Sequence, residues 1–328
     1  MFFLLTYIIN LCYNILMITM GRFAPTPSGR LHIGNVYALL CAWAHVKQQG
    51  GTLVLRIEDL DALRCPKEYA DLIAEDLRWL GLDWDEGAYL GKDEKKYFQS
   101  QRSEIYQEYL NRLEKDGHLF PCFCSRGELH AADAPHLSDG RYRYAGTCRN
   151  LTQEEIAIKK FIRPPALRVR VNDVPINFVD EHYGAQSYIL EEDSGDFIVQ
   201  RSDGVFAYHL AVVVDDALMG VTEIVRGRDL LDSVPVQLYL YKLLGFTPPQ
   251  YCHIPLLVDK TGRRLAKRDK DLDMGILRQK YTPETIIGYI AWQIGLLPQK
   301  EQITAQEFLK IFDVNKLSHE DIILKGEI

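Results

Sequence analysis

The segment RFAPTPSGRLHIGN, residues 22–35, constrains the fold of this chain more than any other feature. A short apolar strand breaks at a turn rich in Pro, Ser and Gly. Residues 31–49 then place apolar side chains at helical spacing, and a pair of glycines ends the run. The next apolar run, TLVLRIEDLD, predicts a buried strand that ends at Glu58 and Asp59. This alternation is typical of a parallel sheet with helices on its faces.

The rest of the chain continues this pattern with one interruption. A length of 328 residues is sufficient for two or three packed units. Residues 121–150 have little periodicity and few apolar side chains, so they form an irregular module. We expect helices at 66–81 and 97–120 and short strands within 165–201. Residues 206–227 should form a helix, then a strand-like apolar run, then a strand. A basic loop at 259–271 follows, and the chain after it should be mostly helical.

Charge and cysteine content limit the class of protein. The formal net charge of -7 does not indicate a nucleic-acid binder, but a local basic face is enough to contact phosphates, so it does not exclude one. Seven cysteines, an odd number spread over a long chain, do not resemble a secreted disulfide framework. We therefore expect a reducing, cytoplasmic location.

The first 19 residues contain no charged side chain and are long enough to span a membrane. They lack the basic region and the cleavage site of a signal peptide. Three alternatives remain for this apolar N-terminal extension of doubtful status: a true start at Met17 or Met20, an ordered apolar extension, or a membrane helix. We favour the first and expect no membrane partner.

Three cysteines in the irregular module form a candidate metal site. Cys122, Cys124 and Cys148 supply three thiolates, and one further ligand would complete a tetrahedral zinc site. His130 and His136 are candidates for the fourth position. The spacing alone leaves structural zinc and incidental cysteines equally open. The remaining cysteines, at positions 12, 41, 65 and 252, are interpreted as buried or incidental.

The start of the helix near residue 32 suits a phosphate. A helix N-terminus presents unpaired N–H groups and a partial positive charge. His32 and Asn35 lie on its first turn and can hydrogen-bond phosphate oxygens as charge develops in a transition state.

RFAPTPSGRLHIGN resembles the signature of class I glutamyl-type aminoacyl-tRNA synthetases, with HIGN in place of the HIGH motif. The segment AYHLAVVVDD followed by RGRDLL is more similar to the glutamyl-queuosine tRNA(Asp) synthetase branch of that family, which lacks an anticodon-binding domain. The end of the chain at Ile328 agrees with that branch. The resemblance extends from Gly21 through RIEDLD (56–61), YFQSQR (97–102), 195–216, 221–231 and 264–268.

The resemblance implies an α/β fold with a Rossmann-type class I catalytic domain, a zinc-containing insertion and a short helical C-terminal region. The implied domains are a catalytic domain at 20–101 and 208–254, an acceptor-binding insertion with the zinc module at 102–207, and a KMSKS-like loop with a helical region at 255–328.

The implied activity is ATP-dependent activation of L-glutamate as glutamyl-adenylate, with Mg²⁺, and transfer to queuosine in the anticodon of tRNA(Asp) by a monomeric enzyme. One alternative is a truncated ordinary glutamyl-tRNA synthetase. Another is a catalytically silent paralogue that binds glutamate or tRNA.

Glutamate carries two carboxylates and one ammonium, so a selective pocket needs cationic side chains for the former and an anion for the latter. Arg22 and Arg226 can face the crevice at the sheet's carboxyl edge, and Glu58 can take the ammonium. The resemblance places the glutamate site at Arg22, Phe23, Ala24, Pro25, Thr26, Glu58, Tyr208 and Arg226.

The ATP site and the zinc ligands also follow from the resemblance. The loop 264–268 resembles the KMSKS loop, in which a lysine stabilises the departing pyrophosphate. It departs from that motif with Arg264 for a lysine and Ala266 for a serine. The implied catalytic residues are His32, Asn35 and Lys267, the ATP-binding residues are His32, Gly34, Asn35 and Lys267, and the zinc ligands are Cys122, Cys124, Tyr144 and Cys148.

Overall fold

The fold is given by a computed structural model that describes residues 19–91, 93–129, 143–173, 175–265 and 272–328. The first part contains β1 (Met20–Phe23), α2 (Ile33–Gln48), β2 (Thr52–Leu55), α3 (Lys67–Trp79), β3 (Glu86–Gly87) and the 3₁₀ turns η1 (Glu94–Tyr97) and η2 (Gln99–Gln101). The middle part contains α4 (Ser103–Lys115), β4 (Leu119–Cys122), α5 (Arg126–Leu129), α6 (Gln153–Ile162), β5 (Ala166–Val169), β6 (Pro175–Asp180), β7 (Gly184–Ile189), α7 (Leu190–Asp193) and β8 (Ile198–Gln200). The last part contains α8 (Tyr208–Leu218), β9 (Glu223–Gly227), η3 (Arg228–Ser233), α9 (Val234–Leu244), β10 (Gln250–Ile254), β11 (Leu257–Val258), α10 (Met274–Lys280), α11 (Pro283–Gln293), α12 (Ala305–Ile311), η5 (Val314–Lys316) and β12 (Ile322–Ile323).

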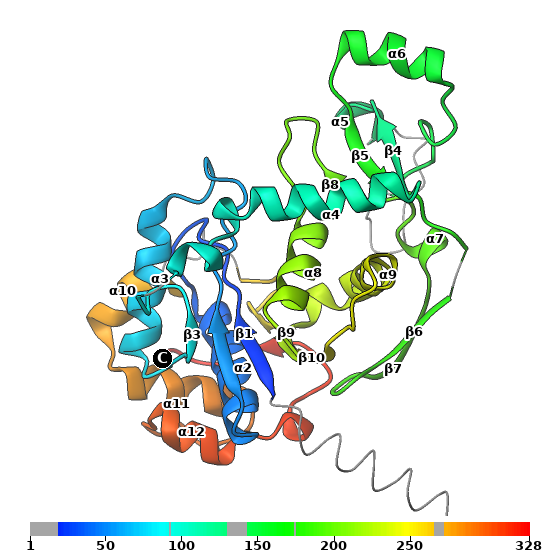
Figure 1. The fold of residues 1–328 in the computed structure, drawn as a ribbon. Coiled ribbons are helices and arrows are strands. Elements are labelled where there is room, and N and C mark those ends of the chain that lie inside the picture. The colour runs from blue at the N-terminus through cyan, green and yellow to red at the C-terminus, as the bar shows by residue number, and fades with distance from the viewer. Residues whose placement is uncertain (1–18, 92, 130–142, 174, 266–271) are drawn as a thin grey trace, which may run out of the picture.

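Parallel strands form the centre of the molecule and confirm the expected Rossmann-type arrangement (Figure 1). β1 pairs with β2 and β2 with β3, while β9 pairs with β10, all in parallel. β1 and β9 meet at their starts, where the Thr222 amide donates to the Met20 carbonyl at 2.8 Å. The other strands of the two sheets extend away from this pair on either side, so a crevice is expected where β1 and β9 end.

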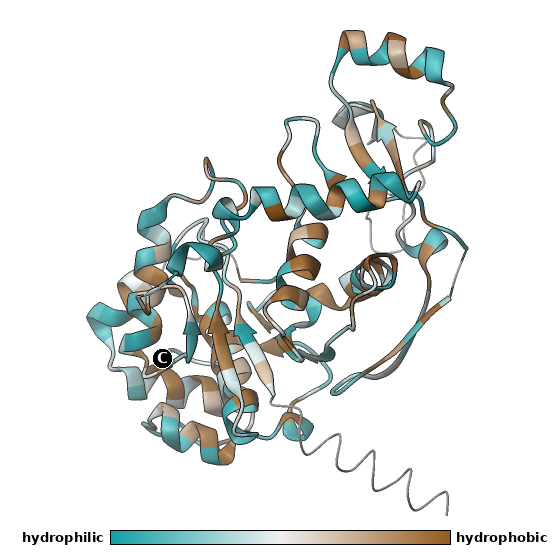
Figure 2. Ribbon diagram, in the orientation of Figure 1, coloured by the Kyte–Doolittle hydropathy of each residue, from teal (hydrophilic) through white to brown (hydrophobic). Residues whose placement is uncertain are grey.

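α2 packs against β1, β2 and β9 and is buried on most of its surface. Its neighbours in the larger core include Phe23, Leu53 and Leu55, together with apolar side chains of α11 and α12. A second core lies between α4, α8 and α9. Figure 2 shows the hydrophobic residues gathered in α2, α8 and the central strands, and hydrophilic residues along α3 and α4.

The elements predicted from the sequence need three corrections. β2 ends at Leu55, so Glu58 and Asp59 lie beyond the strand. The predicted helix at 97–120 contains 3₁₀ turns, α4 and the start of β4. The apolar run at 211–214, predicted as strand-like, belongs to α8. The prediction was wrong because every side chain of this run is buried, so the run has no periodicity that separates a helix from a strand.

The segment predicted as an insertion, 102–207, reaches two places. β4, β5 and β8 form a small antiparallel sheet at the end of α4, and α6 projects beyond it (Figure 1). The β6–β7 hairpin instead returns to the main sheet, where Asp180 pairs with Tyr251 of β10. This return brings Asp180 beside His253 of β10.

Some sequence predictions fall outside the described residues, namely the N-terminal extension up to residue 18, His130, His136, Ala266 and Lys267. In the described part of the chain, no helix combines the length and apolar character needed to cross a membrane.

Candidate active site

A cavity of about 830 Å³ opens where β1 and β9 end. Phe23 does not line it: this side chain is fully buried in the core, and its carbonyl accepts from the Arg56 amide at 2.8 Å. The other described residues predicted for glutamate and ATP all line the cavity, namely Arg22, Ala24, Pro25, Thr26, His32, Gly34, Asn35, Glu58, Tyr208 and Arg226.

One wall of the cavity carries a buried ionic network. Arg56 is fully buried and donates to Asp216 Oδ1 at 2.6 Å and to Glu58 Oε1 at 3.1 Å. Arg22 Nε lies 3.4 Å from the same Asp216 oxygen and has no hydrogen-bond partner within the described ranges. Burial raises the pKa of Glu58, and the positive charges of Arg56 and Arg22 oppose that rise. The network therefore presents an anion and a cation side by side.

The opposite wall holds Arg226 through a chain of buried groups. Its Nε donates to His253 Nε2 at 3.0 Å, and its Nη2 donates to Gln237 Oε1 at 3.0 Å. Burial, with Arg226 adding to it, lowers the pKa of His253 to about 4, so the ring is neutral at pH 7. Its Nδ1 therefore donates to Asp180 Oδ2, 2.6 Å away, and its Nε2 can accept from Arg226. Tyr208 Oη completes this wall, 3.5 Å from Arg226 Nη1.

The start of α2 forms the third side of the cavity. His32 is the N-cap residue, and its Nδ1 accepts from the Gly34 amide at 3.1 Å. The Asn35 side chain accepts from the His32 amide at 3.1 Å, which completes a capping box. With Nδ1 acting as acceptor, a neutral His32 carries its proton on Nε2 and can donate from there. A Cβ at position 34 would lie 3.0 Å from the His32 ring, so only glycine fits beside it without a shift.

Asp229 and Arg30 are charged residues at the cavity that were not selected from the sequence. Asp229 forms an ion pair with Arg264 of the KMSKS-like loop at 2.5 Å, and burial raises the pKa of Asp229 against the opposing charge of Arg264. Arg30 forms an ion pair with the buried Asp76 of α3 at 2.9 Å. Both positions stand inside motifs quoted for the resemblance, GRLHIGN and RGRDLL, which is the signal that could have identified them.

The predicted zinc ligands converge beyond the end of α4. The Sγ atoms of Cys122, Cys124 and Cys148 lie within 4.8 Å of one another, and those of Cys124 and Cys148 are 3.7 Å apart. Tyr144 Oη lies 3.5 Å from Cys122 Sγ and 4.0 Å from Cys124 Sγ. Two thiolates on one tetrahedral zinc would be about 3.8 Å apart, given Zn–S bonds near 2.3 Å. The donor set therefore fits zinc.

Comparison with known proteins assigns the chain to a family. The model of the tRNA synthetases class I (E and Q), catalytic domain, matches residues 19–326. The chain belongs to the class I tRNA synthetases of the E and Q family. The matched region includes the cavity, the thiol cluster and the C-terminal helices.

Several relatives of this class I synthetase are similar over most of its length. It is 46% identical to the glutamyl-Q tRNA(Asp) synthetase of Symbiobacterium thermophilum, over 94% of this chain and 96% of that protein. It is 50% identical to the protein of the same name from Nitratidesulfovibrio vulgaris, over 85% of this chain and 87% of that one. A glutamate–tRNA ligase of Aquifex aeolicus is 37% identical over 93% of this chain and 64% of its own length.

Solved structures agree on the fold of this class I synthetase. A glutamate tRNA ligase from Elizabethkingia meningosepticum, in complex with its amino acid, matches with a TM-score of 0.78 and 27% identity. The match covers 94% of this chain and 67% of the ligase chain. A glutamate–tRNA synthetase from Elizabethkingia anophelis matches with a TM-score of 0.80, also at 27% identity.

Proposed function

We propose that this class I synthetase activates L-glutamate with ATP as glutamyl-adenylate and transfers the glutamyl group to queuosine in the anticodon of tRNA(Asp). One observation carries the activation step: Arg22, Glu58 and Arg226, which are far apart in the sequence, line one cavity beside the start of α2. The choice of acceptor rests on identities of 46% and 50% to glutamyl-Q tRNA(Asp) synthetases, against 35–39% for the glutamate–tRNA ligases compared.

Glutamate recognition follows from the charges of the two walls. Glu58, whose ionised form is favoured by the charges of Arg56 and Arg22, takes the ammonium of the substrate, and Arg22 and Arg226 take its carboxylates. Arg22 has a buried Nε that no described residue satisfies, so a bound carboxylate would supply its missing acceptor. Tyr208 orients the substrate from beside Arg226. Residues 24–26 contribute the floor, and the buried Phe23 supports them from the core.

Adenylate formation is an in-line displacement. A carboxylate oxygen of glutamate attacks the α-phosphorus of ATP, the bond to the bridging oxygen breaks, and pyrophosphate leaves with the electron pair. His32 Nε2, the Asn35 amide group and the N–H groups at the start of α2 donate to phosphate oxygens, and Gly34 leaves space for them. Mg²⁺ bound with ATP supplies further charge neutralisation. Lys267 is assigned to the departing pyrophosphate from its place in the KMSKS-like loop. No side chain serves as a nucleophile.

Transfer needs only a nucleophilic hydroxyl. A hydroxyl of the queuosine cyclopentene-diol attacks the acyl carbon of the adenylate, AMP leaves, and the hydroxyl proton goes to solvent or to the departing phosphate. An anticodon loop presents unstacked bases that suit recognition by a pocket. The acceptor-binding insertion, 102–207, would position this loop.

Cys122, Cys124, Tyr144 and Cys148 would hold a structural Zn²⁺. The segment around them has a small core, formed by Phe120 and Phe123 with the cysteines and Tyr144. A zinc ion would supply the cross-link that this core lacks. We further propose that the enzyme acts as a cytoplasmic monomer, with the catalytic domain at 20–101 and 208–254 and the KMSKS-like loop and helical region at 255–328.

A charging assay tests the acceptor. Purified protein with ATP and radiolabelled glutamate is expected to label queuosine-containing tRNA(Asp), and to leave unmodified tRNA(Asp) and tRNA(Glu) unlabelled. Labelling of tRNA(Glu) at its 3′ end would instead identify an ordinary glutamyl-tRNA synthetase. Glutamate-dependent pyrophosphate exchange tests the activation step by itself, because a catalytically silent paralogue would show none.

A further inference from the structure

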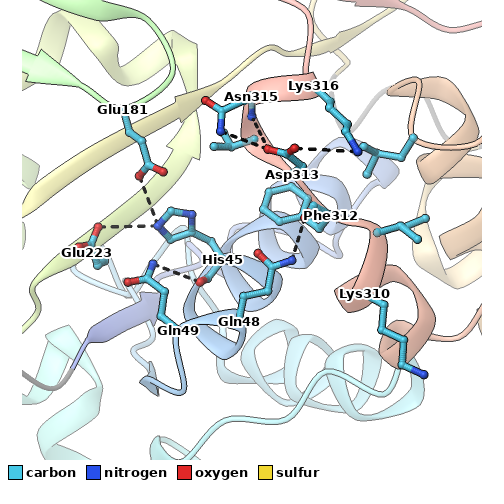
Figure 3. Close-up of a pocket in the computed structure, with 13 residues that line it drawn as sticks. His45, Gln48, Gln49, Glu181, Glu223, Lys310, Phe312, Asp313, Asn315 and Lys316 are labelled. Carbon is cyan, nitrogen blue, oxygen red and sulfur yellow. Dashed lines mark hydrogen bonds and ion pairs between the residues drawn. The ribbon is translucent and has the colours of Figure 1, made fainter. Parts of the chain in front are cut away.

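A second cavity, also of about 830 Å³, lies at the edge of the sheet opposite the active site (Figure 3). Its walls come from segments that are far apart in the sequence. The end of α2 supplies His45, Gln48 and Gln49, the turn after β6 supplies Glu181, β9 supplies Glu223, and the C-terminal region supplies 310–316. None of these residues belongs to the active-site cavity.

His45 points into this cavity between two carboxylates (Figure 3). The residue is only 7% exposed. Its Nε2 lies 3.4 Å from Glu181 Oε2 and 3.8 Å from Glu223 Oε2, yet it has no hydrogen-bond partner anywhere in the described part of the chain. The ring nitrogen is therefore held by two long ionic contacts and by no hydrogen bond of ordinary geometry. A cation held between these three groups would satisfy all of them.

The thiol of Cys252 lies near His45 and Glu181. Cys252 of β10 is fully buried, and the ligand atoms of Cys252, His45 and Glu181 all lie within 4.8 Å of one another. β10 runs beside β9, which begins at Glu223, so the thiol and the second carboxylate come from neighbouring strands. The cluster thus offers one imidazole nitrogen, two carboxylates and one sulfur.

We propose that His45, Glu181, Glu223 and Cys252 form a second Zn²⁺ site. A tetrahedral zinc with Zn–N and Zn–O bonds near 2.0–2.1 Å separates its nitrogen and oxygen ligands by about 3.3 Å, which matches the His45–Glu181 distance of 3.4 Å. Closure of the 3.8 Å separation from Glu223 needs a shift of about 0.5 Å in a partly exposed side chain. On binding, the Cys252 thiol releases its proton to solvent and coordinates as the thiolate.

The donor set selects the class of metal. Mg²⁺ and Ca²⁺ take oxygen ligands almost exclusively, whereas a thiolate with an imidazole is typical of Zn²⁺. On the far wall of the cavity, the charge of Lys316 is partly balanced by Asp313, 3.9 Å away.

The position of this site suggests what the ion would stabilise. Glu181 follows Asp180, and Cys252 precedes His253, so two of the ligands are chain neighbours of the pair that holds Arg226. His45 comes from the helix whose first turn caps the active site. Zinc would therefore join α2, β6, β9 and β10 at the edge away from the chemistry, and it would act on stability.

Zinc content of the purified full-length chain tests the proposal. Mass spectrometry is expected to find one zinc per chain fewer in His45→Gln than in the unmodified protein, whatever the occupancy of the Cys122–Cys148 cluster. Glu181→Gln, at a half-exposed position, should lose the same single equivalent without harm to the core. Lys310→Ala, on the far wall of the same cavity, is the matched control and should keep all its zinc.

A second readout uses the sulfur. Protein reconstituted with Co²⁺ should lose part of its thiolate-to-cobalt absorption in Cys252→Ser, while circular dichroism verifies that the variant is folded. Zinc should also raise the melting temperature of the unmodified chain more than that of Glu181→Gln. Equal zinc content and equal zinc-dependent stabilisation in the unmodified chain, His45→Gln and Glu181→Gln would overturn the proposal and leave only an ion pair at this edge.

Discussion

The glutamate cavity and the Cys122–Cys148 cluster organise their polar groups in opposite ways. In the cavity, two of the charged side chains are held by protein partners: Arg226 by His253, and Glu58 by Arg56. In the cluster, three sulfurs and a phenol face one another within a small core. The first site is thus organised by the protein's own charges, whereas the second gathers ligands that a zinc ion would hold together.

This difference predicts how the two sites respond to change. Removal of one member of a buried charged pair leaves its partner unsatisfied, so a single substitution in the cavity should cause a large loss of glutamate activation. Loss of a zinc ligand should instead loosen the module around it and leave the rest of the fold unchanged. Activation and transfer can be measured separately, which makes the comparison testable.

The largest effect is expected from Arg226→Gln. This change removes the cation that binds a substrate carboxylate and leaves His253 and Gln237 without their donor. We expect kcat/KM for glutamate in pyrophosphate exchange to fall by about a thousandfold. Arg228→Gln is the matched control, since Arg228 is partly exposed, pairs with Asp321 and does not line the cavity. A loss of similar size in both variants would contradict the assignment.

Cys148→Ser should separate the two half-reactions. We expect glutamyl transfer to tRNA to fall by about a hundredfold, as zinc affinity is lost, while pyrophosphate exchange without tRNA stays within about twofold. Cys65→Ser alters another buried cysteine away from the cluster and should affect neither. If Cys148→Ser abolished exchange as well, the zinc module would be part of the activation site and would not act separately from the glutamate cavity.

The pH dependence of activation should report on Glu58. Burial raises the pKa of Glu58 above the ordinary 4.5. Only the carboxylate form binds the substrate ammonium, so binding is intact above the raised pKa and is lost as pH falls through it. We expect kcat/KM for glutamate to drop by about tenfold per pH unit below that pKa, starting at a higher pH than an ordinary glutamate would allow.

Glu58→Gln provides the comparison for this profile. Its kcat/KM should be low and should retain only the titration of the substrate itself. Identical acidic limbs in the two profiles would show that Glu58 is not the group that titrates.

The smallest effect is expected from Gly34→Ala. In most helices this change is stabilising by about 1 kcal/mol. Here the added Cβ would lie 3.0 Å from the His32 ring, so the ring must shift by a few tenths of an ångström. We expect kcat for exchange to fall by about threefold with little change in KM for glutamate, because the rate depends on the placement of a catalytic group. An unchanged kcat would mean that His32 need not be held by the Gly34 amide.

Local sequence placed His32 and Asn35 at the start of a helix, because a strand–turn–helix pattern arises within a few residues. The capping box that the two residues form, and the close contact that favours glycine at position 34, were seen only in the structure. Arg22, Glu58 and Arg226 came from charge reasoning and from spacing within the resemblance. In contrast, Phe23 was included with its neighbours, although alternation along β1 turns its side chain into the core.

What the sequence by itself determined is the order of elements, the motif at the start of α2 and the set of thiols, because these depend on contacts between near neighbours. The tertiary structure alone decided that Asp180 and His253 support Arg226, that the apolar run at 211–214 is helical, and that His45, Glu181, Glu223 and Cys252 meet at one edge. These contacts join segments that are far apart in the chain. They depend on strand order and register, which no local periodicity encodes.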